Sequence, residues 1–119
     1  IRVIALNAKS NEVKNIKKAK RLRVDFELTA NELAEPGEKS IYVCITNPEG
    51  YIISPPDELI EFEYEGSMLP ASAVRKVDYE NEMVAVSIFC DGDNFDKGTY
   101  NVDIYIDGRH CGSGAKNFD

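Results

Sequence analysis

The sequence predicts an all-β domain, a β-sandwich of seven to eight short antiparallel strands. Three observations predict it. Apolar residues recur at every second position in most of the chain, Gly, Pro, Asn and Asp cluster between these runs, and no long stretch carries a helical apolar stripe. A length of 119 residues is that of one ordinary domain, so we expect residues 1–119 to form a single unit.

The clearest strand signals are runs with one apolar and one polar face. Leu22, Val24, Phe26 and Leu28 alternate with charged residues, which is typical of a strand that buries one side. The same alternation predicts strands at 41–46, 60–65, 84–89 and 100–107.

Weaker patterns predict further strands at 2–8, 73–79 and 109–118. The last of these is weakened by Gly112 and Gly114, because glycine has no side chain to pack and favours other conformations. In residues 10–20, Ile16 and Ala19 are too few apolar positions for a docked helix. We therefore expect a loop or a single turn there.

Turn signals separate these runs. Asp107-Gly108 is the strongest, because both residues tolerate the positive φ of a two-residue type I′ hairpin turn. Other turn signals lie at 34–37, 47–50, 54–57, 91–94 and 97–98.

The charge is unevenly distributed. The formal net charge is −7, but residues 1–23 hold eight basic residues and one acid, whereas residues 24–119 hold six basic residues and twenty acids. An acidic body argues against nucleic acid as a partner. The composition also excludes collagen and low-complexity disorder, and the apolar runs are too short for a membrane span.

The first residue is Ile1, so we expect the chain to be a processed product or a domain excised from a longer protein. The three cysteines, Cys44, Cys90 and Cys111, cannot all pair within one chain, and none has a zinc-binding spacing. One disulfide and one free thiol is the alternative in an oxidising compartment. His110 and Cys111 are neighbours on a predicted strand, so their side chains should diverge rather than form a catalytic pair.

Asp96-Lys97-Gly98-Thr99-Tyr100-Asn101-Val102 resembles the tyrosine corner of immunoglobulin-like domains, in which a Tyr hydroxyl bonds back to the nearby backbone. Asp96, Gly98 and Tyr100 match the pattern, while Val102 stands where antibody domains have Cys. The resemblance implies an immunoglobulin-like β-sandwich in which Val102 faces Val24 or Phe26 in place of the disulfide between the sheets.

A second resemblance covers nearly the whole chain. It depends on residues 18–26, 31–37, 41–43 and 47–50, and on Gly98 to Val102 followed by Ile106-Asp107-Gly108. These segments are similar to the C-terminal domain of bacterial membrane-anchored coiled-coil envelope proteins of unknown function. This resemblance implies the cell envelope or periplasm, contact with the membrane only through an upstream segment, and no catalytic residues.

A basic segment is the first candidate interaction site. It comprises Lys14, Lys17, Lys18, Lys20, Arg21 and Arg23. Such a run can contact phosphates, an anionic lipid surface or an acidic protein, but no aromatic residues interleave it for base stacking. The alternatives are a solvated loop and strand face, or pairing with Glu61, Glu63 and Glu65 in the same molecule or a neighbour.

Two ligand-binding alternatives follow from other clusters. Asp91, Asp93 and Asp96 are the carboxylates that a Ca²⁺ site needs, although the spacing is not that of an EF-hand and the same residues favour tight turns. Tyr42, Tyr51 and Tyr105 would suit a carbohydrate platform if they face outward, or would pack across strands.

No nucleophile elbow, phosphate loop or metalloprotease motif is present in the sequence. We therefore predict a non-catalytic protein-interaction or structural module with a protein partner or self-association. A ligand-binding module for carbohydrate or Ca²⁺ is the alternative, and we expect no other cofactor.

Overall fold

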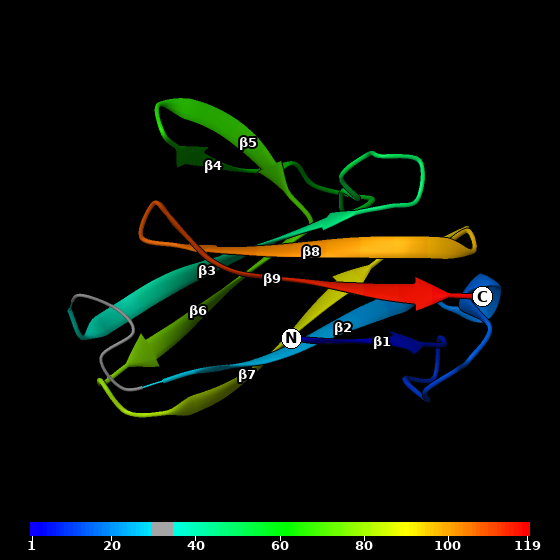
Figure 1. Cartoon of the computed structure of the whole chain (residues 1–119), viewed down its shortest axis with the longest axis horizontal. Coiled ribbons are helices and arrows are strands. Elements are labelled where there is room, and N and C mark those ends of the chain that lie inside the picture. The colour runs from blue at the N-terminus through cyan, green and yellow to red at the C-terminus, as the bar shows by residue number, and fades with distance from the viewer. Residues whose placement is uncertain (30–34) are drawn as a thin grey trace.

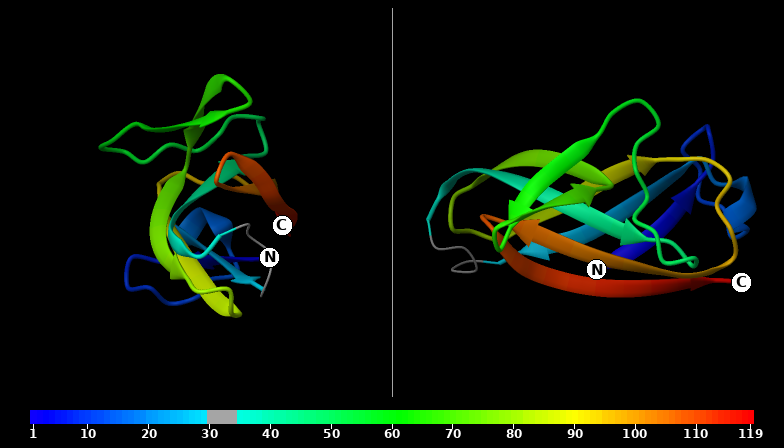
Figure 2. Two further views of the ribbon diagram at one scale, coloured as in Figure 1. Left: turned by 90° about the vertical axis from the view of Figure 1, so that its left-hand side faces the viewer. Right: turned by 90° about the horizontal axis from the view of Figure 1, so that it is seen from above.

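The computed structural model describes residues 1–29 and 35–119, and in this part of the chain it is all-β with nine strands in antiparallel sheets. Three layers are stacked in Figure 1: a two-stranded hairpin above, a four-stranded sheet in the middle and a three-stranded sheet below. The left view of Figure 2 shows the same order of layers. The predicted turn at 34–37 begins outside the described residues.

The lower sheet has the order β1-β2-β7, from β1 (Arg2–Leu6), β2 (Arg21–Leu28) and β7 (Val84–Asp91). The middle sheet has the order β6-β3-β8-β9. Its strands are β6 (Ala73–Tyr79), β3 (Gly37–Thr46), β8 (Gly98–Ile106) and β9 (Arg109–Phe118). All eight predicted strands are present.

The main core lies between these two sheets. The inward residues of the alternating runs fill it, among them Leu22 and Val24 from β2 and Val102 from β8, which are fully buried. Val24 and Val102 both lie in this core, and the half-buried Phe26 packs against it. Apolar burial of this extent is the main stabilising contribution to such a sandwich.

The hairpin consists of β4 (Ile60–Tyr64) and β5 (Ser67–Ala71), and β5 is a strand that the sequence patterns did not predict. It is short, ends in Pro70-Ala71 and shows no clear alternation. The turn Glu65-Gly66 has positive φ at both residues, 51° and 83°, as in a type I′ hairpin.

Ser72 is the single residue between β5 of the hairpin and β6 of the middle sheet. It is 1% exposed, and its N–H donates to the Val43 carbonyl at 2.8 Å while its Oγ accepts from the Ile45 N–H at 2.9 Å. A buried hydroxyl is tolerated when it is hydrogen-bonded in this way. Ser72 therefore anchors the hairpin to β3.

Two smaller predictions are confirmed. The segment 10–20 contains a single 3₁₀ turn, Ile16–Lys18, whose Ile16 is fully buried and whose start is capped by the Asn15 side chain. Asp107 and Gly108 both have positive φ and join β8 to β9 directly.

Candidate functional site

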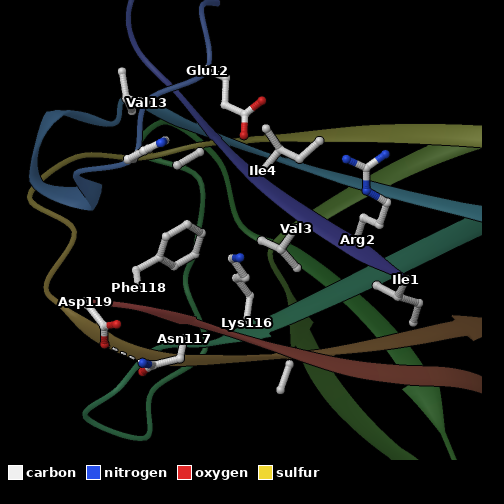
Figure 3. Close-up of a pocket in the computed structure, with 13 residues that line it drawn as sticks. Ile1, Arg2, Val3, Ile4, Glu12, Val13, Lys116, Asn117, Phe118 and Asp119 are labelled. Atoms are coloured by element: carbon white, nitrogen blue, oxygen red, sulfur yellow. Dashed lines mark hydrogen bonds between the residues drawn. The ribbon is translucent and has the colours of Figure 1, made fainter.

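A groove runs along one side of the sandwich, where edge strand β1 of the lower sheet lies opposite edge strand β9 of the middle sheet. Its volume is about 620 Å³. In Figure 3, Lys116 and Phe118 project from β9 toward β1, which contributes Val3 and Ile4. We refer to this hollow as the β1–β9 groove.

The sequence makes this groove by keeping β1 and β9 as separate edges. A Cβ atom on Gly114 would lie 3.1 Å from the Ile1 Cβ, and one on Gly112 would lie 3.5 Å from the end of the same side chain. The two glycines thus let the start of the chain approach β9 closely. Farther along, Val13 donates its N–H to the Ala5 carbonyl at 2.9 Å and closes the other end of the β1 edge.

The groove carries more cations than anions. Its charged side chains are Arg2, Lys14 and Lys116 against Glu12 and Asp119. Lys14 is the member of the predicted basic segment that lines it, and it forms no ion pair within the described residues. The apolar part of the wall comes from both strands, so an occupant would meet apolar surface with a cationic rim.

The opposite side of the sandwich, between β6 and β7, is bridged. The Arg75 Nη1 atom donates to the Ser87 carbonyl on the neighbouring sheet at 2.5 Å. Ser87 in turn donates its hydroxyl to Asp25 at 2.7 Å. Hydrogen bonding of this kind occupies the edge of β7, a common protection of free strand edges.

The structure brings three of the six residues of the predicted basic segment to the predicted acidic aspartates. Lys17 lies 3.7 Å from Asp96, and Lys20 lies 2.5 Å from Asp93. Arg21 lies 2.6 Å from Asp91, and Arg23 pairs with Asp25 on its own strand. Half of the basic segment therefore pairs with the end of β7 and the loop after it. Within the described residues, the segment makes no ion pair with the exposed Glu61, Glu63 and Glu65 of the hairpin.

These pairs bear on the carboxylates considered for Ca²⁺. The hydrogen bond from Lys20, with a further one from the Asn94 N–H, holds the pKa of Asp93 below its ordinary value. Within residues 1–29 and 35–119, no group of three His, Cys, Asp or Glu side chains is arranged to hold a metal ion. The three aspartates face lysine and arginine partners instead.

The tyrosines considered for carbohydrate are divided. Tyr42 and Tyr105 are directly opposite each other on the paired strands β3 and β8. Phe62 of the hairpin packs over both, with ring centroids 4.8 Å from Tyr42 and 5.0 Å from Tyr105. Tyr51 is 72% exposed on a separate loop, so the three rings do not form one open platform.

The three cysteines are free thiols in this structure. Burial raises the pKa of Cys44 to about 11 and that of Cys90 to about 12, and nearby carboxylates, Asp103 and Asp91 respectively, act in the same direction. Buried thiols with raised pKa values are poor nucleophiles.

Cys111 is the partly exposed cysteine, and it occupies the irregular position where the pairing of β8 with β9 shifts register. Its sulfur lies 3.5 Å from the Arg109 carbonyl. The neighbouring His110 ring instead contacts Asp103 at 2.9 Å. The two side chains thus have different partners.

Sequence patterns alone did not identify the β1–β9 groove. Its residues come from the two ends of the chain, and strands β1 and β9 belong to different sheets. The available signal was the run of apolar residues at the start together with Phe118 at the end, next to glycines that permit close approach.

The fold defines the class of protein as an all-β domain of antiparallel sheets. No helix in the described residues is long and apolar enough to cross a membrane. The chain belongs to the family described as "Domain of unknown function (DUF8428)", whose model matches residues 1–119. No curated protein and no solved structure matches the chain.

Proposed function

We propose that this domain is a non-catalytic protein-interaction module, and that the β1–β9 groove binds an extended segment of a partner protein. The observation that carries this proposal is a groove of about 620 Å³ bordered by two edge strands. An edge strand presents unpaired backbone N–H and C=O groups, and an added strand from a partner satisfies them.

The residues that line the groove support a partner with both acidic and apolar side chains. The groove is lined by three cationic side chains, Arg2, Lys14 and Lys116, and by two anionic ones. Val3 and Phe118 supply apolar contact. An extended chain alternates its side chains between two faces. The best occupant is therefore a segment that alternates apolar and acidic residues.

We also propose that the sandwich is immunoglobulin-like. Two features support this assignment: a three-stranded sheet packed on a four-stranded one, and the Tyr100 hydroxyl, which donates to the Asp96 carbonyl at 2.6 Å. The β4–β5 hairpin would then be an insertion between the third strand and the next strand of its sheet.

The proposed location is the bacterial cell envelope or periplasm, and it rests on the resemblance to envelope-protein domains. Membrane attachment would require an upstream segment. Cell fractionation of the parent protein tests this part separately. Recovery in the cytosolic fraction alone would contradict the location without bearing on the groove.

The function is tested by selecting binders from a displayed library of extended peptides. We expect selected peptides to alternate apolar and acidic residues, and the double variant Lys14→Glu/Lys116→Glu to weaken their binding about tenfold, which corresponds to about 1.4 kcal/mol. The matched control is Lys9→Glu/Lys18→Glu, which changes the charge equally at exposed positions outside the groove.

The control variant should bind within about twofold of the unchanged protein, since exposed charges far from a contact contribute little. Equal weakening by both double variants would mean that overall charge, not the groove, attracts the peptides. If the selected peptides match the sequence of β1 or β9, the partner would be a second copy of this chain. Sedimentation measurements would then test for self-association.

A further inference from the structure

A second hollow lies on the other face of the four-stranded sheet, beneath the β4–β5 hairpin. Its volume is about 310 Å³. Three aromatic and three acidic residues line it: Tyr42, Phe62, Tyr105, Glu38, Glu63 and Asp107. No Lys, Arg or His is among the residues that line it.

The three rings form one wall. The ring of Phe62 is stacked on Tyr42, with centroids 4.8 Å apart and planes 18° from parallel. The same Phe62 ring is 5.0 Å from Tyr105 and tilted by 42°. The faces of aromatic rings carry negative electrostatic potential and attract cations within about 6 Å.

The carboxylates differ in how far they are already neutralised. Asp107 is held by Lys39 at 2.7 Å. Glu38 has only a long contact, 3.9 Å, to Lys76, and about two thirds of each of these side chains is exposed. Glu63 forms no ion pair with the described residues. Glu38 and Glu63 thus leave negative charge beside the rings.

Other rings of this protein already have cations. The Arg21 guanidinium lies 5.2 Å from the centre of the Phe89 ring, and the Lys116 ammonium lies 5.8 Å from that of Phe118. In the described residues, no lysine or arginine lies over the rings of Tyr42, Phe62 or Tyr105. These three rings therefore line a hollow with three carboxylates, of which Lys39 neutralises one, and the His110 ring packs against Tyr105 at 5.1 Å.

We propose that this hollow binds an organic cation, an alkylammonium or guanidinium group. The rings would contact the apolar shell of the cation and its positive charge, while Glu38 and Glu63 balance that charge. The site is separate from the β1–β9 groove and shares none of its residues, so either proposal can fail alone.

The test is an NMR titration of the whole chain, followed on the ring resonances of Tyr42 and Tyr105. The probes are choline, N-acetyl-lysine amide and N-acetyl-arginine amide, and the neutral control is 3,3-dimethylbutan-1-ol, which has the shape of choline without its charge. We expect saturable shifts with at least one cation, and at least about fivefold weaker binding of the neutral control. The tightest cation indicates whether the natural source is a quaternary amine or a protein side chain.

The double variant Glu38→Gln/Glu63→Gln should weaken cation binding about fivefold, equal to about 1 kcal/mol. The matched control Glu58→Gln/Glu61→Gln removes the same charge at exposed positions that do not line the hollow, and should bind as before. If the first variant proves unstable, Glu63→Gln alone serves. No saturation by any cation, equal binding of the neutral control, or equal loss in both double variants would overturn the proposal.

Discussion

At the scale of single residues, Tyr100 shows how one side chain fixes a whole corner. It is 1% exposed, its ring meets Phe95 and Phe118 edge-on, and its hydroxyl donates to the Asp96 carbonyl. Gly98 makes the turn possible, since its φ is +138° and a Cβ there would lie 2.7 Å from the Pro48 side chain. The motif Asp96 to Tyr100 could be recognised in the sequence because its defining hydrogen bond, from Tyr100 to Asp96, joins residues only four positions apart.

The substitution Tyr100→Phe should lower the free energy of unfolding by about 1–2 kcal/mol, because it removes a donor from a partly buried carbonyl. Thermal unfolding measures this as a lower Tm. Tyr51→Phe is the control, because the Tyr51 side chain is largely exposed. A Tyr100→Phe protein as stable as the control would show that the hydroxyl does not hold the corner.

The cysteines give a second prediction at this scale. In the native protein, Cys111 should react with a thiol reagent at neutral pH far faster than Cys44 or Cys90, since these two are buried with pKa values raised to about 11 and about 12. After denaturation all three should react alike. Rapid labelling of Cys90 without unfolding would contradict the position of β7 in the core.

At the scale of elements, neither the ion pairs of the basic segment nor strand β5 could be predicted from the sequence. The basic segment and the loop after β7 are separated by about 70 residues, as in the Lys20–Asp93 and Arg21–Asp91 pairs. Each segment alone suggests an external ligand, and only their juxtaposition shows that they pair. Strand β5 was missed because Pro70 and a short, non-alternating run hide it.

These ion pairs predict a dependence on pH and salt. The pKa of Asp93 is lowered in the folded protein, so its contribution to stability is present above its ordinary pKa of 3.8 and is lost as pH falls through the lower folded value. A double-mutant cycle on Lys20 and Asp93 should show favourable coupling at low salt that shrinks at about 1 M salt.

A cycle on Lys76 and Glu38 is the control, because that pair is 3.9 Å apart and exposed. It should show little coupling at any salt concentration. Coupling of Lys20 with Asp93 that is absent at low salt would mean that the basic segment is free for external partners.

The hairpin gives a further prediction. Phe62 is 5% exposed and joins a small core with Cys44 and Ala71, separate from the main core between the sheets. Phe62→Ala should therefore release the hairpin at a cost of about 3 kcal/mol while the two sheets persist. Hydrogen exchange should show loss of protection in β4 and β5, with β2, β7 and β8 unchanged; global loss would contradict a separate core.

At the scale of the whole molecule, the sequence was sufficient for the class of fold and for eight of the nine strands, because alternation is a local signal that one buried face imposes on each strand. It was not sufficient for the candidate site. The β1–β9 groove is formed by the two ends of the chain, and residues at positions 2 and 116 line one groove only through the packing of the two sheets.

The packing of distant segments also explains how charge is distributed over the folded protein. The net charge of −7 conceals a basic N-terminal part, and folding neutralises much of that part against Asp91, Asp93 and Asp96. Lys14 lies apart from these pairs and lines the groove. The protein therefore presents a cationic groove on an otherwise acidic body, which favours an acidic segment in that orientation.

The most direct test of the central claim is residue-resolved amide hydrogen exchange of the domain with and without a selected acidic peptide. We expect added protection at alternating residues at the end of β9, over 115–118, and at the start of β1, with no change along the edge of β7. Protection that appears on β6 or β7, or binding that leaves β9 unprotected, would contradict the β1–β9 groove as the interaction site.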